Sequence, residues 1–590
     1  MLYYICIKTT NESYNFSIGK ERNKDEKRKK RNTKRKMKKK NITNLVRIIL
    51  LIIIFVILAI ILNKYIIFDK NKTTNLVINN NNVTSRLKNS VLQEDGVIYL
   101  SEDDISNFFD KHIYLEKENN KIITTYNKKI AEVSLEENVI NINGSTKKTS
   151  AHAIEKDNTI YLPISEMTEV YDIEIGNNDE AKVITLDSLS KEQKKAIVTS
   201  SLSVKSSTNF LAKTIDRIKK GESIVVISTD KKYSKIRTEK GKIGYIKTNK
   251  IANEYMVRDN MTDEKQIDGK VNMTWDYYSE IADAPDRSGT TIDGVNVVSP
   301  SFFYIDENGE IKDNVGDSGK AYIEWAHDNG YKVWPMVSNA PAAKASLDIT
   351  SNIMNSYENR KKLIEKLEDY CVEYKLDGLN IDFENMKQED KDMYSRFIIE
   401  ITPRLNEIGM VVSVDVTAPD GGETWSMCFD RNVIGDVANY IVFMAYDEYG
   451  VSSNKSGTTS GYDWIKLNLV KFLQTEEIKE NKIILGIPFY TRLWTEDSNG
   501  QIVRTSTVNM KDIDQILPEG IEKKWDNDLK QNYVEFQDGS NTRKMWIEDI
   551  QSLKEKLSLI KDNDLAGVSS WQKDMETDDV WQLIKEELGE

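Results

Sequence analysis

The sequence contains little cysteine and little histidine. Its 590 residues include three of each. The cysteines, Cys6, Cys371 and Cys428, lie far apart and form no Cys-x-x-Cys pair, which excludes a disulfide framework and a zinc ribbon. The histidines are equally scattered, so a histidine-based metal centre or catalytic triad is not expected. We therefore predict a protein without a metal site or a cofactor.

The chain is too long for a single globular domain, because one hydrophobic core stops growing at roughly 250–300 residues. Its net charge of −12 combines unlike parts. Residues 1–43 contain 15 Lys/Arg and 4 Asp/Glu, a net charge of +11 that leaves −23 for the rest. A nucleic-acid contact is one interpretation of the basic run. Beside an apolar segment, however, a topology signal that contacts anionic lipid is favoured, and no nucleic-acid partner is expected.

The apolar segment next to this tail has the length of a membrane span. Residues 48–62 contain no polar side chain, and flanking apolar residues extend the run to 44–68. About 20 such residues cross a bilayer. A cleaved signal peptide is the alternative, but no small-x-small cleavage site follows the run. We expect a transmembrane helix at 44–68, with the tail 1–43 cytoplasmic and the rest extracytoplasmic, in a single-pass protein of the cell membrane.

After an Asn- and Thr-rich linker at 69–90, the chain repeats itself. DGVIYLSEDDISNFF at 95–109 is echoed by DNTIYLPISEMTEVY at 157–171. Each copy reads as a turn, a β-rich triplet and an amphipathic stretch with apolar residues at helical spacing. The pattern resembles the copper amine oxidase N-terminal domain, which implies a small α+β module over 91–188. It implies no copper, because the histidines in this range are single and unpatterned.

Residues 195–255 read as a small all-β domain. Short alternating strands recur at spacings of about 10 residues between Gly and charged turns. The sequences KGE at 220–222 and GKIGYIK at 241–247 resemble bacterial SH3-like domains. This resemblance implies either a contact with a wall peptide or a rigid spacer, and both interpretations stay open.

In residues 261–590, β-rich runs alternate with helical patterns. Eight runs separated by helices indicate a (β/α)₈ TIM barrel, whose active site lies at the carboxyl ends of the strands. Residues 490–549 form an α+β insertion that we expect to wall one side of a groove. The eight runs begin at residues 271, 294, 331, 376, 409, 440, 482 and 565.

The fourth run, LDGLNIDFE, places polar side chains inside the predicted barrel. Because strand side chains alternate, Asn380, Asp382 and Glu384 share the inward face. Carboxylates at i and i+2 lie roughly 6.5–7 Å apart along the strand, close enough to perturb one another. A solvated edge strand is the alternative, but an alternating β/α chain covers both faces of its sheet.

These residues match the Asp-Gly-x-Asp-x-Asp-x-Glu signature of glycoside hydrolase family 18, with Asn380 replacing the middle Asp. The motifs MAYD at 444–447, LGIPFYTRLW at 485–494 and SSW ending at Trp571 support the resemblance. Together they are similar to the branch of spore cortex-lytic N-acetylglucosaminidases that act on peptidoglycan.

The resemblance implies a retaining, substrate-assisted mechanism through an oxazolinium ion. Glu384 would be the acid and base, Asp382 would orient the 2-acetamido group, and Tyr446 would donate a hydrogen bond to its carbonyl. An Asn at 380 cannot share a proton with Asp382, so a shifted acid limb of the pH profile is expected. The further substrate-binding candidates are Asn380, Trp571, Asp447, Trp275, Asn339 and Asp415.

The predicted function is hydrolysis of β-1,4 bonds next to N-acetylglucosamine in peptidoglycan by a membrane-anchored extracytoplasmic glycosidase. Hydrolysis of chitin or chitooligosaccharides is the alternative enzyme function. A barrel that binds glycans without cleaving them is an alternative of another class. Since such proteins usually lack the acid, the presence of Glu384 and Asp382 favours an enzyme whose partner is an N-acetylglucosamine-containing polysaccharide.

Overall fold

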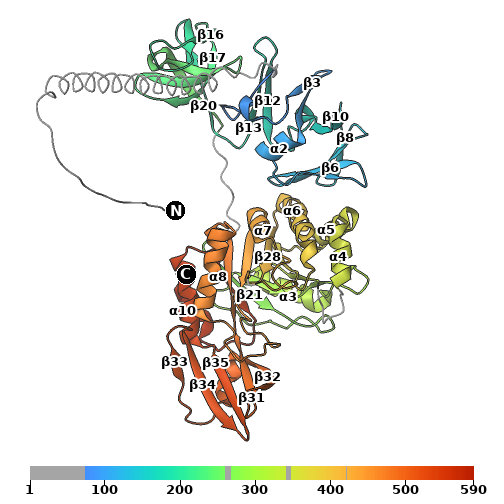
Figure 1. Cartoon of the computed structure of the whole chain (residues 1–590), viewed down its shortest axis with the longest axis vertical. Coiled ribbons are helices and arrows are strands. Elements are labelled where there is room, and N and C mark those ends of the chain that lie inside the picture. Colours follow the sequence, from blue (N-terminus) through green and yellow to red (C-terminus); the bar gives the residue numbers. More distant parts are fainter. Residues whose placement is uncertain (1–73, 259–266, 340–346, 420, 590) are drawn as a thin grey trace, which may run out of the picture. The chain divides into compact units, whose positions relative to one another are not determined.

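The computed structural model describes residues 74–258, 267–339, 347–419 and 421–589, which fall within one compact unit (Figure 1). The predicted tail and transmembrane helix lie outside these described residues.

The single-pass membrane location is corrected by the structure. Within the described ranges no helix is both long and apolar enough to cross a bilayer. The longest, α5 (Tyr357–Glu373) and α6 (Lys391–Glu407), have 17 residues each and carry several charged side chains. Crossing requires about 20 predominantly apolar residues. This finding contradicts the prediction.

The first module contains three small sheets and begins earlier than predicted. Strand β1 pairs in parallel with β13, and Leu76 on β1 is completely buried. The predicted linker 69–90 is therefore wrong from residue 75 onward, since this segment supplies core residues. The strands are β1 (Asn75–Ile78), β2 (Asn81–Asn82), β3 (Leu92–Glu94), β4 (Val97–Ser101), β5 (Tyr114–Glu116), β6 (Lys121–Tyr126), β7 (Lys129–Ser134), β8 (Val139–Ile142), β9 (Ser145–Lys148), β10 (Ile154–Lys156), β11 (Thr159–Leu162), β12 (Ile173–Asn178) and β13 (Val183–Ser188).

The two sequence repeats differ in their helical parts. The first forms helix α2 (Glu102–Phe108), which Ser101 caps by accepting a hydrogen bond from the Asp104 N–H. The second forms only a 3₁₀ turn, Ile164–Glu166, directly after Pro163. The helix expected in the second repeat is thus limited to a single turn.

The next region is all β. Its seven strands form one antiparallel sheet in the order β16-β15-β19-β18-β17-β14-β20. The all-β prediction is confirmed, while the likeness to SH3 domains stays a prediction. The strands are β14 (Gln193–Val198), β15 (Leu202–Lys205), β16 (Thr214–Ile218), β17 (Ser223–Thr229), β18 (Tyr233–Thr238), β19 (Ile243–Lys247) and β20 (Ile251–Arg258).

The barrel has eight strand positions, and two of its strands are split. The second strand consists of β22 and β23, and the third of β25 and β26, while the short β24 flanks β23. The first strand, β21, pairs with the last, β36, and closes the ring. The strands are β21 (Val271–Asp276), β22 (Val297–Pro300), β23 (Phe303–Ile305), β24 (Ile311–Asp313), β25 (Lys332–Val333), β26 (Met336–Ser338), β27 (Gly378–Asp382), β28 (Val411–Val416), β29 (Tyr440–Met444), β30 (Ile483–Pro488) and β36 (Gly567–Trp571).

Helices surround these strands (Figure 1). Leu379 and Ile381 of β27, and Phe383 directly after it, belong to the apolar core between strands and helices. The Phe383 ring packs against Tyr394 and Phe397 of α6 at centroid distances of 5.8 and 5.7 Å. The predicted inward face of β27 is thereby confirmed. The other helices are α3 (Gly316–Asp328), α4 (Leu347–Asn355), α7 (Arg431–Val437), α8 (Tyr462–Val470), α10 (Ile550–Asp562) and α11 (Val580–Leu588).

The insertion is a five-stranded antiparallel sheet with a small core of its own. Its first strand follows β30 after one residue, and Figure 1 shows the sheet at one end of the barrel. The insertion is mostly β, because its one α-helix has four residues. Its elements are β31 (Tyr490–Glu496), β32 (Ile502–Asn509), α9 (Ile513–Ile516), β33 (Lys524–Asp526), β34 (Gln531–Asp538) and β35 (Asn541–Ile547).

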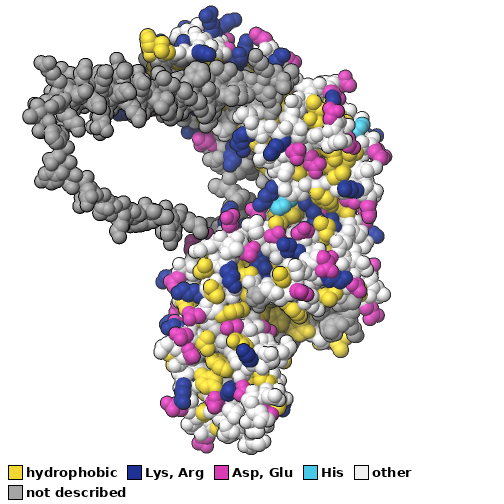
Figure 2. All heavy atoms as spheres, viewed as in Figure 1, with side chains coloured by type: hydrophobic (Ala, Val, Ile, Leu, Met, Phe, Trp, Pro, Cys, Tyr) yellow, Lys and Arg dark blue, Asp and Glu magenta, His cyan; other side chains and the backbone are white. Residues whose placement is uncertain are grey.

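Charged side chains of both signs are mixed on one face of the protein. Figure 2 shows Lys and Arg interspersed with Asp and Glu on the face displayed. A face of this kind offers no broad field of one sign to steer a charged polymer. Attraction of a charged polymer to this face therefore depends on local contacts.

Candidate active site

Three polar side chains project inward from the end of β27. Asn380 pairs in register with Met336 on one side and Ser413 on the other, and Asp382 ends the strand. Asn380 and Asp382 are buried, whereas part of Glu384 is open to solvent. The alternation of β27 therefore leads from a buried amide, through a buried carboxyl, to a carboxyl that a substrate can reach.

Burial perturbs both carboxyl groups of this ladder. Desolvation and the neighbouring Asp415 carboxylate raise the pKa of Asp382 to about 8. Desolvation raises the pKa of Glu384 well above its usual range, and the charge of Asp382 and a hydrogen bond to it act in the same direction. A glutamic acid that keeps its proton at neutral pH is suited to general acid catalysis.

Asn380 belongs to a hydrogen-bonded chain across β27 and β28. The Ser413 Oγ donates to Asn380 Oδ1 at 2.8 Å, and Asn380 Nδ2 donates to Asp415 Oδ2 at 2.6 Å. All three residues are essentially without solvent exposure. Asn380 and Asp415, predicted to bind substrate, therefore act below the substrate surface.

Asn339, another predicted substrate-binding residue, holds the backbone of Glu384. Its Oδ1 accepts a hydrogen bond from the Glu384 N–H at 2.8 Å, and its Nδ2 donates to the Glu384 carbonyl at 2.9 Å. The same Nδ2 lies 3.2 Å from Thr350 Oγ1. Since its side chain is buried and fully engaged, Asn339 is a positioning residue for Glu384.

Asp447 lies at the rim, three residues after the end of β29, and contacts the first strand of the insertion. Its Oδ1 accepts hydrogen bonds from the Tyr490 hydroxyl and from Arg492 Nη2, both at 2.7 Å. Tyr490 and Arg492 share one face of β31. The charge of Asp447 also contributes to the raised pKa of Glu384. The insertion therefore builds part of the site as well as walling it.

Aromatic side chains line the opening. Trp571, which ends β36, lies 5.6 Å from Trp275 and 5.7 Å from Tyr277 between ring centroids. Trp571 faces the pocket, but Trp275 is buried beneath it and has no surface for a sugar. Trp425, in the segment after β28, is 50% exposed at the pocket edge.

The pocket has a volume of about 350 Å³. It brings together the predicted residues Glu384, Tyr446, Asp447 and Trp571. The sequence interpretation missed Trp425, Arg492 and several other lining residues. Arg492 follows Tyr490 by two positions in the quoted LGIPFYTRLW motif, so strand alternation could have identified it. The remaining lining residues are Thr417, Met444, Tyr490, Thr507 and Met575.

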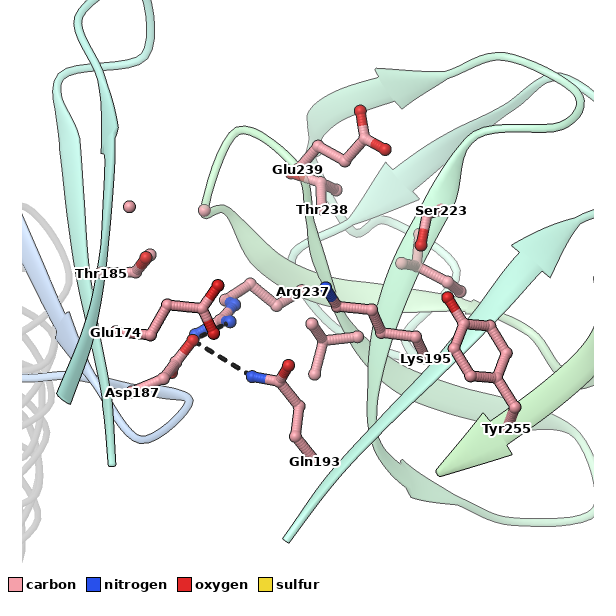
Figure 3. A pocket seen from close by; sticks show the side chains of 14 residues that line it. Glu174, Thr185, Asp187, Gln193, Lys195, Ser223, Arg237, Thr238, Glu239 and Tyr255 are labelled. Atoms are coloured by element: carbon pink, nitrogen blue, oxygen red, sulfur yellow. Dashed lines mark hydrogen bonds and ion pairs between the residues drawn. The ribbon is translucent and has the colours of Figure 1, made fainter. Parts of the chain in front are cut away.

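A second pocket of about 310 Å³ lies between β13 and the following sheet (Figure 3). Figure 3 shows Asp187 and Arg237 pointing toward each other, with Arg237 Nη1 at 2.7 Å from Asp187 Oδ1. Gln193 Nε2 donates to Asp187 Oδ2 at 3.2 Å. Its buried charges thus compensate one another, and they provide no carboxyl pair comparable to that of β27.

Comparisons with known proteins identify the family of the barrel region. A family model described as glycosyl hydrolases family 18 matches residues 272–576, and one described as copper amine oxidase N-terminal domain matches 77–186. The uncharacterized glycosylase YvbX of Bacillus subtilis is 28% identical over 49% of this chain and 84% of its own length. The cortical fragment-lytic enzyme of the same organism is 22% identical over 43% of this chain and 59% of its own length. The crystal structure of a chitinase from Chromobacterium violaceum has a TM-score of 0.48 and 21% identity, covering 54% of this chain and 99% of that one.

Proposed function

Because the chain belongs to glycosyl hydrolase family 18, we propose that it cleaves β-1,4 bonds next to N-acetylglucosamine with retention of configuration. The observation that carries the proposal is the pair formed by Asp382, which ends β27, and Glu384, two residues beyond it. Both have raised pKa values, and Glu384 opens into a pocket that can hold a sugar. This pair favours an enzyme over a barrel that only binds glycans.

In the proposed first step, protonated Glu384 donates its proton to the glycosidic oxygen. The substrate's own acetamide oxygen attacks the anomeric carbon and forms an oxazolinium ion. Asp382, two residues before Glu384, orients the acetamide N–H and stabilises the positive charge. In the second step Glu384 takes a proton from water, which opens the oxazolinium ring and restores the acid.

Two rim residues complete the proposed subsite. The Tyr446 hydroxyl donates a hydrogen bond to the acetamide oxygen, which lowers the freedom of the nucleophile. The Trp571 ring supplies an apolar floor beneath the sugar. Asp447 is fixed by its contacts with the insertion through Oδ1, and its Oδ2 can accept a hydrogen bond from a sugar hydroxyl.

We propose peptidoglycan as the substrate class. The support is a relative, the cortical fragment-lytic enzyme of Bacillus subtilis, of which the chain covers 59%. Chitin oligomers offer the same linkage and the same acetamide, and they are the alternative substrate. The 310 Å³ pocket of Figure 3, which Lys195 and Glu239 flank, supports a further proposal that this region contacts a wall peptide.

The test compares purified full-length protein with Glu384→Gln on peptidoglycan and on chitin oligomers, with products identified by mass spectrometry. Loss of the general acid should lower kcat by at least about 100-fold. Glu389→Gln, at an exposed position five residues away, is the matched control. The proposed substrate is supported if peptidoglycan, and not the chitin oligomers, yields products that end in a reducing N-acetylglucosamine. Equal activity of Glu384→Gln and wild type would refute the assigned acid.

The wall-peptide proposal is tested by sedimentation of the full-length protein with peptidoglycan whose glycan strands the protein cannot cleave. Lys195→Gln should reduce the bound fraction, whereas the exposed control Lys231→Gln should not. Equal binding by the two variants would favour the spacer interpretation.

A further inference from the structure

Asp382 and Asp415 occupy neighbouring positions on adjacent parallel strands. Ile381 of β27 pairs with Val414 of β28, so the next residues in register are these two acids. Adjacent strands lie about 4.8 Å apart, and both side chains point into the barrel. The barrel interior therefore holds a second carboxyl pair, formed across two strands, in addition to the pair along β27.

One oxygen of each acid has no partner in the described structure. Asp382 Oδ1 and Asp415 Oδ1 are both inaccessible to solvent and accept no hydrogen bond. A buried carboxylate oxygen without a donor is costly, and two adjacent buried carboxylates repel each other. A single proton placed between these oxygens would satisfy both conditions, because it provides the donor and removes one charge.

The hydrogen-bond chain through Asn380 determines which oxygen of Asp415 is free. Ser413 Oγ donates to the Asn380 carbonyl oxygen, which turns the Asn380 amide nitrogen toward Asp415 Oδ2. That donor occupies Oδ2 at 2.6 Å and leaves Oδ1 unpaired. Asn380, which cannot exchange a proton itself, thus orients a neighbouring carboxyl group that can.

No cation is among the groups that act most strongly on these acids. From β21, the Trp275 indole N–H lowers the pKa of Asp415, although it makes no hydrogen bond in the described structure. Burial raises the pKa of the Tyr394 hydroxyl on α6, which has no hydrogen-bond partner in the described structure, and the charges of both acids raise it further. Glu384 acts on Asp415 by charge. The groups that interact with the pair are thus indole, phenol, amide and carboxyl groups, and the charges of both acids also raise the pKa of the buried Tyr446 hydroxyl.

We propose that Asp415 is the proton-sharing partner of Asp382 in the free enzyme. One proton lies between their Oδ1 atoms. This inference rests on the function proposed above. When the oxazolinium ion forms, the O–H bond to Asp382 breaks and the proton belongs wholly to Asp415, which leaves Asp382 fully anionic beside the cation. The proton returns when water opens the ring, so the cycle consumes none. Asp415 is a positioning residue, since it does not touch the substrate.

The first test needs no substrate. In full-length Glu384→Gln protein, infrared spectroscopy across pH follows the remaining buried carboxyl groups without the signal of the acid. Removing the partner with Asp415→Asn should lower the midpoint at which Asp382 loses its proton by about one pH unit or more, a tenfold change in proton affinity. An unchanged midpoint would overturn the proposal. Asp392→Asn, an exposed substitution on α6, is the control.

The exchange variant Asn380→Asp/Asp415→Asn keeps one amide and one carboxyl in the same volume. It guards against loss of folding, and it should return the Asp382 midpoint toward that of the parent. In the wild-type background, Asp415→Asn should lower kcat by about tenfold or more with little change in KM and should shift the acid limb of kcat. An acid limb identical to wild type would refute the role of Asp415. Absence of hydrolysis by the wild type would refute the proposed function instead, and the infrared result would still decide the shared proton.

Discussion

Asn339 holds the backbone of Glu384 and does not contact the substrate. Removing its side chain should therefore impair Glu384 indirectly. Asn339→Ala deletes one acceptor and one donor that hold the Glu384 backbone at 2.8 and 2.9 Å. Each hydrogen bond contributes about 0.5–1.5 kcal/mol net, and a buried backbone group left without a partner costs about 1–3 kcal/mol. We therefore expect the barrel to lose about 2–4 kcal/mol of stability.

The catalytic effect of Asn339→Ala should exceed what partial unfolding explains. Glu384 lies beyond the end of β27, so these two hydrogen bonds replace the ladder that would otherwise fix it. A displacement of about 1 Å can cost about 100-fold in rate. We expect kcat to fall by about 10- to 100-fold at a temperature where the variant is fully folded by circular dichroism, with KM changed little.

Asn339→Asp separates the two contacts in the same assay. It keeps the acceptor for the Glu384 N–H but loses the donor to the carbonyl, so its kcat should fall between wild type and Asn339→Ala. Asn308→Ala, at an exposed turn, is the control. A folded Asn339→Ala enzyme with kcat within about twofold of wild type would refute the positioning role.

Three other perturbations have defined outcomes. Gly567→Ala should prevent barrel closure, because an added Cβ would lie 1.9 Å from a backbone carbonyl of β21, and thermal unfolding should show loss of the barrel transition. Lys556→Met leaves its completely buried partner Glu548 uncompensated, and should cost about 3–5 kcal/mol in denaturant unfolding. Arg492→Met removes the cation that offsets Asp447, so the catalytic acid should hold its proton to higher pH and the alkaline limb of kcat should move upward.

Each of these predictions has a matched comparison. Gly450→Ala meets no atom closer than 3.9 Å and should fold normally. Lys556→Met combined with Glu548→Leu should recover most of the lost stability, because no charge then remains buried alone. A downward shift of the alkaline limb in Arg492→Met would contradict the electrostatic role of Asp447. Equal stability of the single and double Lys556 variants would contradict the uncompensated charge.

Local periodicity explains why the central part of the site could be predicted. Along β27 and the two residues after it, the period of two alone separates Leu379, Ile381 and Phe383 from the three inward polar residues, and the structure has this arrangement. The roles of Asn339 and Asp415 could not be predicted in the same way. Their strand-end positions were visible, but whether a side chain reaches the substrate or a neighbouring backbone depends on strands that meet only in the folded barrel.

The error at residues 75–90 has its physical origin in long-range structure. The polar composition of residues 75–90 indicates a linker, yet Leu76 is buried because β1 pairs with β13, more than 100 residues later. The insertion was expected as α+β, but its strands pair mainly with one another.

The pairing of β21 with β36 also determines when the active site can exist. Val271 and Gly567 are neighbours in the closed ring, although nearly the whole catalytic domain separates them in sequence. Contacts of such long separation form late, and a chain emerging from the ribosome cannot make them until its final strand is available. Glu384 is synthesised long before Trp571, so the proposed acid is present before the aromatic ring proposed to lie beneath the sugar. The nascent chain is therefore expected to remain inactive until β36 has been synthesised.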